Sequence, residues 1–379
     1  MGDTLNDWKI LKLGNILDVK HGKNQKEVEV LGGKYPILGT GGEIGRTNDY
    51  LYNKPSVLIG RKGTIDKPKY IDTPFWTVDT LFYTNIKAGY EPKWLYYRFC
   101  KIPWKKYNEA TGVPSLSAST IKNIKIEIPT FDEQKKIASI LSTWDKAIEL
   151  KEKLIEQKKE QKKGLMQKLL TGEVRLPGFK GKWEKVYLKD VVIGKGKYGI
   201  NAPSVEKSSE LPTYLRITDI SDEGYVHTNG LQSVNHPNSN DYFLEKNDIV
   251  FARTGASTGR TYLYDNSDGK LVYAGFLIKF SIDTNKAVPK YIKFCTQTEE
   301  YHNWVGVMSM RSGQPGINAE EYGQLPINLP PIKEQLEISN ILSYLEREIL
   351  LLESEREMIT NQKNGLMQLL LTGKVRVKV

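Results

Sequence analysis

The amino-acid sequence predicts an α+β protein in which two mixed α/β domains are joined by two long antiparallel coiled-coil helices, as a pseudo-twofold internal repeat. The first observation is a repeated phrase: GLMQKLLTGEVRL in the middle of the chain returns as GLMQLLLTGKVRV at its end. The second is a pair of proline-free stretches with helical hydrophobic spacing. The third is the segment before each stretch, where short apolar runs alternate with turn residues, as in strands and loops.

The repeat extends far beyond the shared phrase. Aligning the two phrases gives an offset of 201 residues, which holds without a gap back to GVP in the first copy and GQP in the second. Upstream the offset falls to 192, where Arg61 matches Arg253, and to 175, where Trp8 matches Trp183. The second copy therefore has longer loops. The period is too long for a solenoid and indicates a duplicated domain followed by a duplicated helix.

Two long helices are predicted over residues 133–170 and 334–371. Pro129 and Pro330-Pro331 stand just before them, where a missing N–H does no harm, and Gly172 and Gly373 are suited to end them. Hydrophobic residues at steps of three and four form the seam of a coiled coil. The candidates for packing of the helix pair and for docking of partner subunits are Ile137, Leu141, Trp144, Ile148, Leu165, Ile338, Leu342, Leu345, Ile349 and Leu366.

Lys151, Lys158 and Lys162 interrupt the seam of the first helix. They belong either to a solvated face or to a surface that meets a partner subunit or a phosphate backbone. The sequence thus divides into a first domain, a central helix, a second domain and a C-terminal helix, with boundaries at 1–130, 131–178, 179–330 and 331–379.

Composition favours a polyanion partner. The 379 residues carry a net charge of +10, but the excess lies in the first half: residues 1–130 hold 20 Lys and Arg against 13 Asp and Glu, whereas residues 176–331 hold 17 of each. No apolar run approaches the roughly 18 residues that a membrane span requires, and the N-terminal segment does not resemble a leader, so we expect a cytoplasmic protein. Cys100 and Cys295 follow similar phrases and are expected to be buried, reduced thiols.

The motifs of common enzymes fail on inspection. The glycines of GTGGEIG do not give the dinucleotide-binding spacing, and GASTGRT has three residues between its glycines and an arginine where a P-loop requires lysine. The four histidines have no cysteine or carboxylate at metal-binding spacing. We therefore predict no catalytic residues, no metal site and no cofactor bound by this chain.

Polar loops with arginine, lysine and small residues remain, and they occur in both copies. Arginine can bind guanine O6 and N7 together, and hydroxyl groups and backbone N–H groups beside glycine can approach phosphates. For any single arginine, an intramolecular ion pair is an equally good interpretation. The predicted DNA-binding residues are Lys23, Thr40, Arg46, Arg61, Lys62, Lys195, Lys197, Arg216, Arg253, Thr254, Arg260, Arg311 and Ser312.

The duplicated pattern, with EQ, ILS, GLMQ, LTG and VR at matching positions in both copies, resembles the specificity subunit of type I restriction-modification systems. The resemblance covers essentially the whole chain. It implies that residues 1–130 and 180–330 are target recognition domains, each reading one half of a bipartite site in double-stranded DNA. It also implies that the helices form a spacer and dock two methyltransferase (modification) subunits.

By the same resemblance, the modification subunits carry S-adenosylmethionine and methylate adenine, while restriction subunits add translocation and cleavage driven by ATP and Mg²⁺. The chain itself would catalyse nothing. Two alternatives stay open: a DNA-modifying enzyme with a dispersed active site, and a coiled-coil adaptor whose domains bind proteins. Because the second domain is neutral, we expect the isolated chain to bind DNA weakly and with strong salt dependence.

Overall fold

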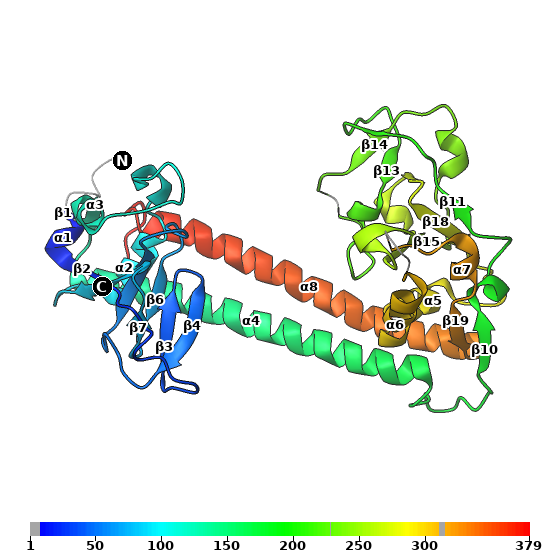
Figure 1. The fold of residues 1–379 in the computed structure, drawn as a ribbon, viewed down its shortest axis with the longest axis horizontal. Coiled ribbons are helices and arrows are strands. Elements are labelled where there is room, and N and C mark those ends of the chain that lie inside the picture. Colours follow the sequence, from blue (N-terminus) through cyan, green and yellow to red (C-terminus); the bar gives the residue numbers. More distant parts are fainter. Residues whose placement is uncertain (1–7, 228, 311–314) are drawn as a thin grey trace. The chain divides into compact units, whose positions relative to one another are not determined.

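A computed structural model describes residues 8–227, 229–310 and 315–379. The chain forms two compact units, and each takes one domain together with parts of both long helices (Figure 1). The first unit comprises Met1–Lys153 and Glu353–Val379, and the second comprises Leu154–Leu352. The C-terminal part of the chain therefore completes the N-terminal domain.

The first unit contains a four-stranded sheet in the order β2-β8-β5-β6, a three-stranded sheet in the order β4-β3-β7, and the pair β1-β9. Every pairing is antiparallel except that of β3 with β7. The strands are β1 (Lys9–Lys12), β2 (Leu17–His21), β3 (Tyr35–Gly39), β4 (Gly42–Thr47), β5 (Ser56–Gly60), β6 (Lys69–Ile71), β7 (Trp76–Thr77), β8 (Leu81–Ile86) and β9 (Lys125–Ile128). The short helices are α1 (Leu13–Ile16), α2 (Pro92–Phe99) and α3 (Ala118–Asn123).

The second unit repeats this plan, with sheets in the order β11-β18-β15-β16 and β12-β14-β13-β17 and the pair β10-β19. Its parallel strand pair, β13 with β17, corresponds to that of β3 with β7. The strands are β10 (Glu184–Tyr187), β11 (Lys197–Tyr198), β12 (Ser204–Val205), β13 (Thr213–Leu215), β14 (Gln232–Val234), β15 (Asp248–Ala252), β16 (Thr261–Leu263), β17 (Leu271–Tyr273), β18 (Leu277–Ser281) and β19 (Pro326–Leu329). The helices are α5 (Pro289–Cys295), α6 (Glu299–Met308) and α7 (Ala319–Gly323), and short 3-10 turns occur in both units.

The strand β12 and the helix α6 of the second unit lie in the two regions where the sequence offset changes and where longer loops were predicted. Both units place a strand that is buried along its whole length, β5 or β15, beside its sheet partners, β8 or β18. A strand covered on both sides supports a loop at its end rigidly, because few groups around it can move.

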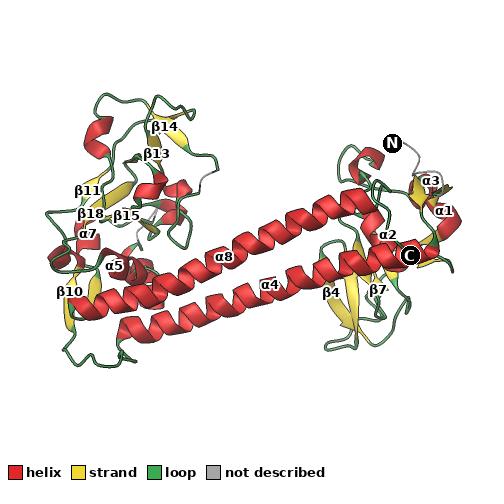
Figure 2. Ribbon diagram, turned by 180° about the vertical axis from the view of Figure 1, so that it is seen from behind, coloured by secondary structure: helices red, strands yellow, loops and turns green. Residues whose placement is uncertain are grey.

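The two long helices are α4 (Phe131–Thr171) and α8 (Ile332–Leu370). The predicted ranges are confirmed to within two residues. Gly172 and Gly373 follow the helices with φ of 76° and 69°, a left-handed conformation that glycine adopts without strain. Within each unit the helix segments run antiparallel, since residues later in α4 contact residues earlier in α8. Helices are red in Figure 2.

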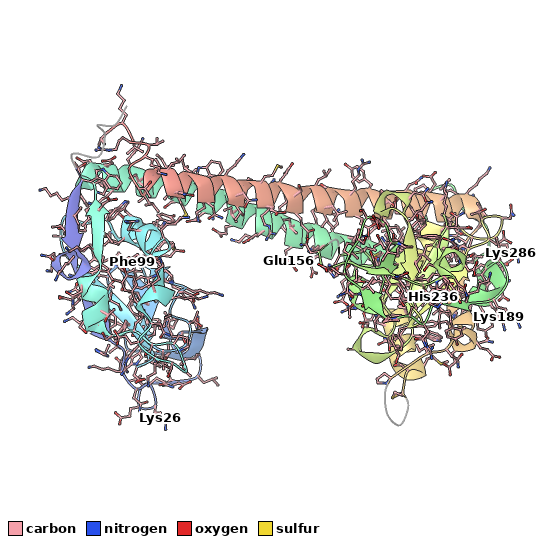
Figure 3. All side chains as sticks on the ribbon, turned by 90° about the horizontal axis from the view of Figure 1, so that it is seen from above. Lys26, Phe99, Glu156, Lys189, His236 and Lys286 are labelled. Atoms are coloured by element: carbon pink, nitrogen blue, oxygen red, sulfur yellow. The ribbon has the colours of Figure 1, made fainter. Side chains whose placement is uncertain are left out.

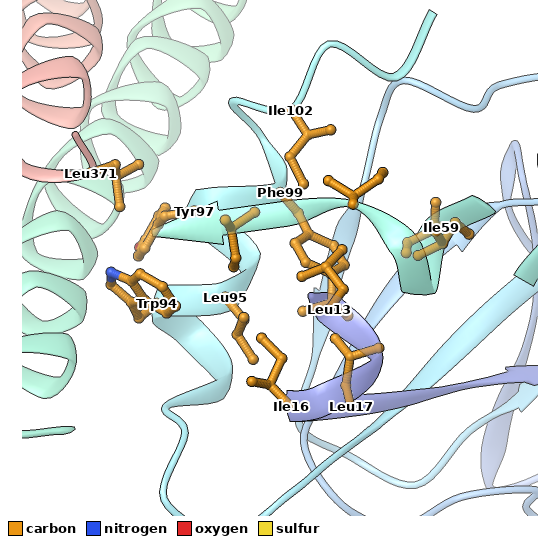
Figure 4. Packing of buried hydrophobic residues seen from close by; sticks show 14 of the residues in the cluster. Leu13, Ile16, Leu17, Ile59, Trp94, Leu95, Tyr97, Phe99, Ile102 and Leu371 are labelled. Atoms are coloured by element: carbon orange, nitrogen blue, oxygen red, sulfur yellow. The ribbon is translucent and has the colours of Figure 1, made fainter. Parts of the chain in front are cut away.

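The core of the first unit joins its domain to both helices. Figure 4 shows Trp94, Leu95, Tyr97 and Phe99 of α2 packed among buried side chains of the domain, with Leu371 nearby. Ile137 and Leu141 of α4 belong to the same cluster and are fully buried. At about 25 cal/mol per Å² of apolar surface, burial of this kind is the main stabilising contribution to the unit.

Two expectations for single residues need revision. The lysines in the seam are not a solvated face alone: Lys151, Lys158 and Lys162 form ion pairs with glutamates of α8 at 2.8, 2.8 and 3.1 Å. Cys100 and Cys295 are free thiols, as predicted, but Cys100 is exposed and Cys295 is only partly buried. Cys100 lies immediately after the last residue of α2, where the chain leaves the core.

The predicted fold class, two mixed α/β domains joined by two long helices with an internal repeat, is confirmed. Among the described residues, neither long helix nor any shorter one is apolar enough to cross a membrane.

Candidate nucleic-acid interface

The loop after the buried central strand has the same construction in both units. In the first unit the N–H of Gly63 donates to the carbonyl of Pro114 at 2.8 Å, and in the second the N–H of Gly255 donates to that of Pro315 at 3.1 Å. These are the glycines and prolines of the repeated RKG/RTG and GVP/GQP motifs. The sequence repeat thus marks two segments, distant in sequence, that contact each other in each unit.

The backbone of the arginine that precedes this glycine is held from both sides. The N–H of Arg61 donates to the carbonyl of Thr80 at 2.8 Å, and its own carbonyl accepts from Leu116 at 2.9 Å. Arg253 makes the equivalent bonds with Phe276 at 3.0 Å and Ile317 at 2.9 Å. Both arginines are therefore fixed at the end of a rigid strand, as a side chain that recognises a ligand requires.

Four of the predicted arginines pair with carboxylates of their own domain. The pairs are Arg46–Glu43 at 2.9 Å, Arg61–Asp79 at 2.9 Å, Arg216–Asp219 at 2.6 Å and Arg260–Asp222 at 2.7 Å. The alternative of an intramolecular ion pair thus holds for all four, and a DNA contact by any of them stays a prediction.

Arg216 and Arg260 share one local task, because both bind the segment that includes Asp219 and Asp222. Arg216 donates to both carboxylate oxygens of Asp219, and Arg260 donates to the carbonyl of Ile220 at 3.1 Å. The hydrogen bonds with Asp219 raise the pKa of Arg216 above its ordinary value. These arginines order a loop whatever else they contact.

Arg253 differs from the other four. Its guanidinium lies over the ring of Tyr198, 4.9 Å from the ring centroid, a cation–π contact. No carboxylate of the described residues pairs with it. Its neighbour Thr254 donates to the carbonyl of Pro315.

The remaining candidates lie on loops and at strand ends. Lys23, Lys62, Lys195 and Lys197 are exposed. The hydroxyl of Thr40 lies close to the Gly63 loop, at 3.9 Å from the position of a Cβ added at that glycine. Arg311 and Ser312 lie outside the described residues. Figure 3 places Lys26, three residues after Lys23, on the side of the first domain away from the helix ribbons.

The helix candidates fall into two groups. Buried residues serve the packing of the units: Ile137, Leu141, Ile338, Leu342, Leu345 and Ile349. Leu165 and Leu366 are partly buried against the two main cores, and Trp144 and Ile148 are also partly exposed. A partner subunit can contact only what is accessible, so docking by the buried residues would need rearrangement.

Sequence reasoning missed the contacts that close each unit. In the first unit, Arg376 near the C-terminus forms a two-pronged ion pair with Glu133 at 2.7 and 2.9 Å. The indole N–H of Trp8 donates to the same carboxylate at 3.2 Å, and Arg376 lies over the Trp8 ring. We name Trp8, Glu133 and Arg376 the first clasp.

The second unit has the same arrangement in Trp183, Glu334 and Arg175, which we name the second clasp. Arg175 donates to both oxygens of Glu334 at 2.7 and 2.8 Å, and Trp183 donates at 3.2 Å. The hydrogen bonds with Glu334 raise the pKa of Arg175. The tryptophan, the EQ pair and the VR pair all recur in the sequence repeat, so the residues of both clasps could be found from the sequence. The sequence does not show that the VR arginine of one copy binds the EQ glutamate of the other.

The glutamine of each EQ pair anchors a short helix. The Gln134 side chain accepts from the N–H of Glu91 at 2.9 Å, and Gln335 accepts from Val288 at 2.8 Å. Both acceptors lie at the start of a long helix, and both donors precede a helix of the domain, α2 or α5. Each domain is therefore attached to its long helix by the same polar contacts.

The described residues contain no group of three or more His, Cys, Asp or Glu side chains placed to hold a metal ion.

Comparison with known proteins adds independent findings. The family model described as type I restriction modification DNA specificity domain matches residues 6–159 and 180–361. The chain is 27% identical to the type I restriction enzyme MjaVIII specificity subunit of Methanocaldococcus jannaschii, over 98% of this chain and 94% of that one. It is 22% identical to the EcoDI specificity subunit of Escherichia coli, over 88% and 80%.

Its fold is similar to the crystal structure of a type I restriction-modification system S subunit from M. genitalium. That match has a TM-score of 0.66 at 17% identity and covers 98% of this chain and 97% of the other. A second similar chain has a TM-score of 0.56 at 12% identity. It comes from a structure described as giving the structural basis of complex assembly and conformational transition of the type I R-M system.

Proposed function

The chain belongs to the family of type I restriction-modification DNA specificity domains, and on that premise we propose that each of its two domains reads one half of an asymmetric bipartite DNA site. The observation that carries this proposal is the arginine loop. Arg61 and Arg253 occupy equivalent positions, fixed by equivalent backbone bonds, at the end of equivalent buried strands. The two arginines have the same position in their domains, but the side chains around them differ.

The difference between the two loops supports two different half-sites. Asp79 neutralises Arg61, whereas Arg253 lies on a tyrosine ring without a carboxylate partner in the described chain. A guanidinium that is free to pair with a base edge prefers guanine, and one shared with a carboxylate presents both a donor and an acceptor. Two domains of this kind would read different bases.

The partners are double-stranded DNA and the other subunits of a type I complex, and two modification subunits per chain fit the repeat. Exposed apolar residues recur at the 201-residue offset on the long helices: Phe131 matches Ile332, and Leu150 matches Leu351. Surfaces present twice in one chain suit two copies of one partner. These four residues are better docking candidates than the buried seam.

The chain acts without catalysis in this proposal. The S-adenosylmethionine for adenine methylation belongs to the modification subunit, and ATP and Mg²⁺ belong to the restriction subunit. The contribution of this chain is to fix where on the DNA those subunits act. Turnover by the purified chain with labelled S-adenosylmethionine, or with Mg²⁺ and plasmid, would instead support a dispersed active site.

The decisive experiment is to produce the chain together with its modification subunit and to map methylated adenines across a host genome by single-molecule sequencing. We expect an asymmetric motif in two parts separated by an unspecified spacer. A stable complex that methylates nothing, and shows no preference in a random-oligonucleotide selection, would support the protein-binding adaptor.

The long helices also allow a test of spacing. Removing one heptad from each helix, Lys151–Gln157 and Leu352–Met358, preserves helical phase and shortens each by about 10 Å. If helix length sets the distance between half-sites, the spacer should shorten by about three base pairs, at 3.4 Å per pair. An unchanged spacer would mean that helix length does not set it.

A further inference from the structure

We propose that Phe276 of the second domain is an apolar wedge that stacks into a base step of the second half-site, beside Arg253 and Tyr198. The inference rests on the proposed function, since it names side chains within the second domain's contact with DNA. Phe276 lies in the turn between β17 and β18, and 57% of its surface is exposed. An exposed phenylalanine at a fixed turn carries a hydrophobic cost that a stacking partner would remove.

Sheet register places the three side chains on one face. Ala252 pairs with Leu277 across β15 and β18, so the next pair is Arg253 with Phe276, and the bond from the Arg253 N–H to the Phe276 carbonyl agrees. Tyr198 of β11 lies opposite Ile278, two residues beyond Phe276. Residues opposite one another, and those two apart along a strand, share a face of a sheet.

Further inward, this face is mainly apolar and buried. Phe251, Ile278 and Phe280 lie on it and are buried in the core of the second unit. The strands β11, β18 and β15 lie side by side in Figure 1. Arg253, Phe276 and Tyr198 thus form the end of a packed surface, not a set of mobile loop residues.

The arrangement also holds Arg253 ready for a ligand. Its backbone is fixed by Phe276 and Ile317, and its guanidinium rests on a ring whose hydroxyl accepts from the N–H of Ala319 at 3.1 Å. Tyr198 is 41% exposed, so its ring supports the arginine while one side stays accessible. A planar cation and an exposed ring side by side suit a base edge and a base face.

The residues around Arg61 in the first unit differ from those around Arg253 in the second. The carbonyl that accepts from the arginine belongs to Thr80 in the first unit and to Phe276 in the second, so Asp79 corresponds to Gly275. Phe82 and Ile278 then correspond, which matches His21 with Tyr198. Phe276 therefore stands where the first unit has Thr80, and Gly275 stands where it has Asp79. Tyr198 stands where the first unit has His21.

Glycine at position 275 has a local reason. A Cβ at this position would lie 3.3 Å from the carbonyl oxygen of Ile200, a tight contact, and the Gly275 N–H donates to that carbonyl at 2.8 Å. The close approach of the two segments therefore disfavours an aspartate here. Without that carboxylate, Arg253 keeps its charge for a partner outside the chain.

The test uses the full chain in complex with its modification subunit on a duplex that carries the mapped motif. 2-Aminopurine, whose emission rises when it is unstacked, replaces single bases of the second half-site that are not adjacent to the methylated adenine, because a methyltransferase unstacks its target by flipping it out of the duplex. We expect a rise at one base step with the wild-type chain, its loss with Phe276→Ala, and its retention with Phe276→Trp. Base–aromatic stacking of this kind should make the Phe276→Ala complex weaker by roughly tenfold or more.

Salt dependence separates the wedge from a charge effect. Phe276→Ala removes no charge, so log Kd against log salt should keep its slope, whereas Arg253→Ala should lower the slope by about one unit if the arginine contacts a phosphate. Thr80→Ala, at the equivalent position of the first unit, is the matched control and should leave the second half-site unchanged. Methylation specificity at the first half-site reports that the Phe276 and Arg253 variants are folded, and specificity at the second half-site reports the same for Thr80→Ala.

The outcomes distinguish the two proposals. A wild-type complex that methylates its motif but shows no emission rise at any probed step, or a rise that survives Phe276→Ala, overturns the wedge and leaves the proposed function intact. A wild-type complex with no sequence preference overturns the proposed function itself.

Discussion

The two units are alike in the contacts that hold each of them together and different in the loops that we propose to contact DNA. Both have a clasp of tryptophan, glutamate and arginine, a glutamine that anchors a short helix, and a glycine loop bound to a proline carbonyl. The loop face differs, with Asp79 and Thr80 in one unit and Gly275 and Phe276 in the other. A duplicated domain can therefore change the side chains on one loop face while its framework residues stay the same.

The polar contacts between the long helices show the same contrast. Asp145 and Glu346 correspond at the 201-residue offset, as do Lys363 and Lys162, and each unit pairs the acidic residue with the lysine. The third member differs: Tyr97 donates to Asp145, whereas Lys293 pairs with Glu346 at 3.3 Å. The second unit thus places two lysines around one glutamate, whose side chain is 14% exposed.

The largest effect should come from breaking the first clasp. Arg376→Ala leaves the Glu133 carboxylate, only 2% exposed, without its cation. A buried charge left unpaired costs about 3–5 kcal/mol, so the free energy of unfolding of the first unit should fall by that amount. Denaturant unfolding combined with hydrogen exchange at residues 131–141 would measure the loss and its location.

Arg376→Lys is the matched control for that clasp. It keeps the charge but not the two parallel hydrogen bonds, so it should fall between wild type and alanine. Arg175→Ala should leave the hydrogen exchange of the first unit unchanged and should increase exchange at residues 332–342 of the second unit. Equal loosening of both units by either variant would show that the clasps do not act on separate units.

Glu346→Gln should have the next largest effect, because it leaves Lys162 and Lys293 close together without a counter-charge. We expect the second unit to lose about 2–3 kcal/mol of unfolding free energy at neutral pH. Asp145→Asn is the comparison in the first unit, and it should cost less because Asp145 is 41% exposed and faces one lysine. A larger loss from Asp145→Asn would contradict this ranking.

The pH dependence of Glu346 has a defined sign. Burial raises the pKa of Glu346, but Lys293 and Lys162 outweigh burial, so the pKa lies below its ordinary value of 4.5. A carboxyl with a lowered pKa in the folded state adds stability that is complete above 4.5 and is lost as pH falls through the folded pKa. The difference between wild type and Glu346→Gln should therefore stay constant from pH 7 to about 5 and shrink in more acidic solution.

Trp8→Phe should weaken the first clasp more mildly. The substitution keeps an aromatic ring, although a smaller one, and it removes the indole N–H that donates to Glu133. A hydrogen bond to a charged group contributes about 1.5–3 kcal/mol, and the ion pair with Arg376 remains, so a loss near the lower end is expected. Trp183→Phe in the second unit should give a similar change in thermal unfolding, and a difference above about 1 kcal/mol between the two would mean that the clasps are not equivalent.

The smallest change in stability should come from Asp79→Gly, which gives the first unit the residue of the second. The Arg61–Asp79 pair is largely exposed, so its loss should change stability by less than about 1 kcal/mol. It frees one cation, and the salt slope of DNA binding by the complex should steepen by about one unit if Arg61 then contacts a phosphate. An unchanged slope would place Arg61 away from the phosphates.

The sequence by itself determined the repeat, the two long helices and the family. These features depend on local patterns: a 201-residue offset without gaps, spacing of three and four, proline before a helix and glycine after it. The lettered motifs EQ, VR and the two tryptophans were also visible. Their meaning was not, because a repeat shows that two segments are equivalent and does not show which segments touch.

Only the tertiary structure decided how the chain is closed and which arginines are occupied. Arg376 meets Glu133 across 243 positions of sequence, so the last residues complete the first domain. Arg46, Arg61, Arg216 and Arg260 find carboxylates, and Arg253 finds a tyrosine ring. Charge pairing depends on a few ångströms of separation between loops, and loop positions are set by packing of the whole domain, which no local pattern in the sequence specifies.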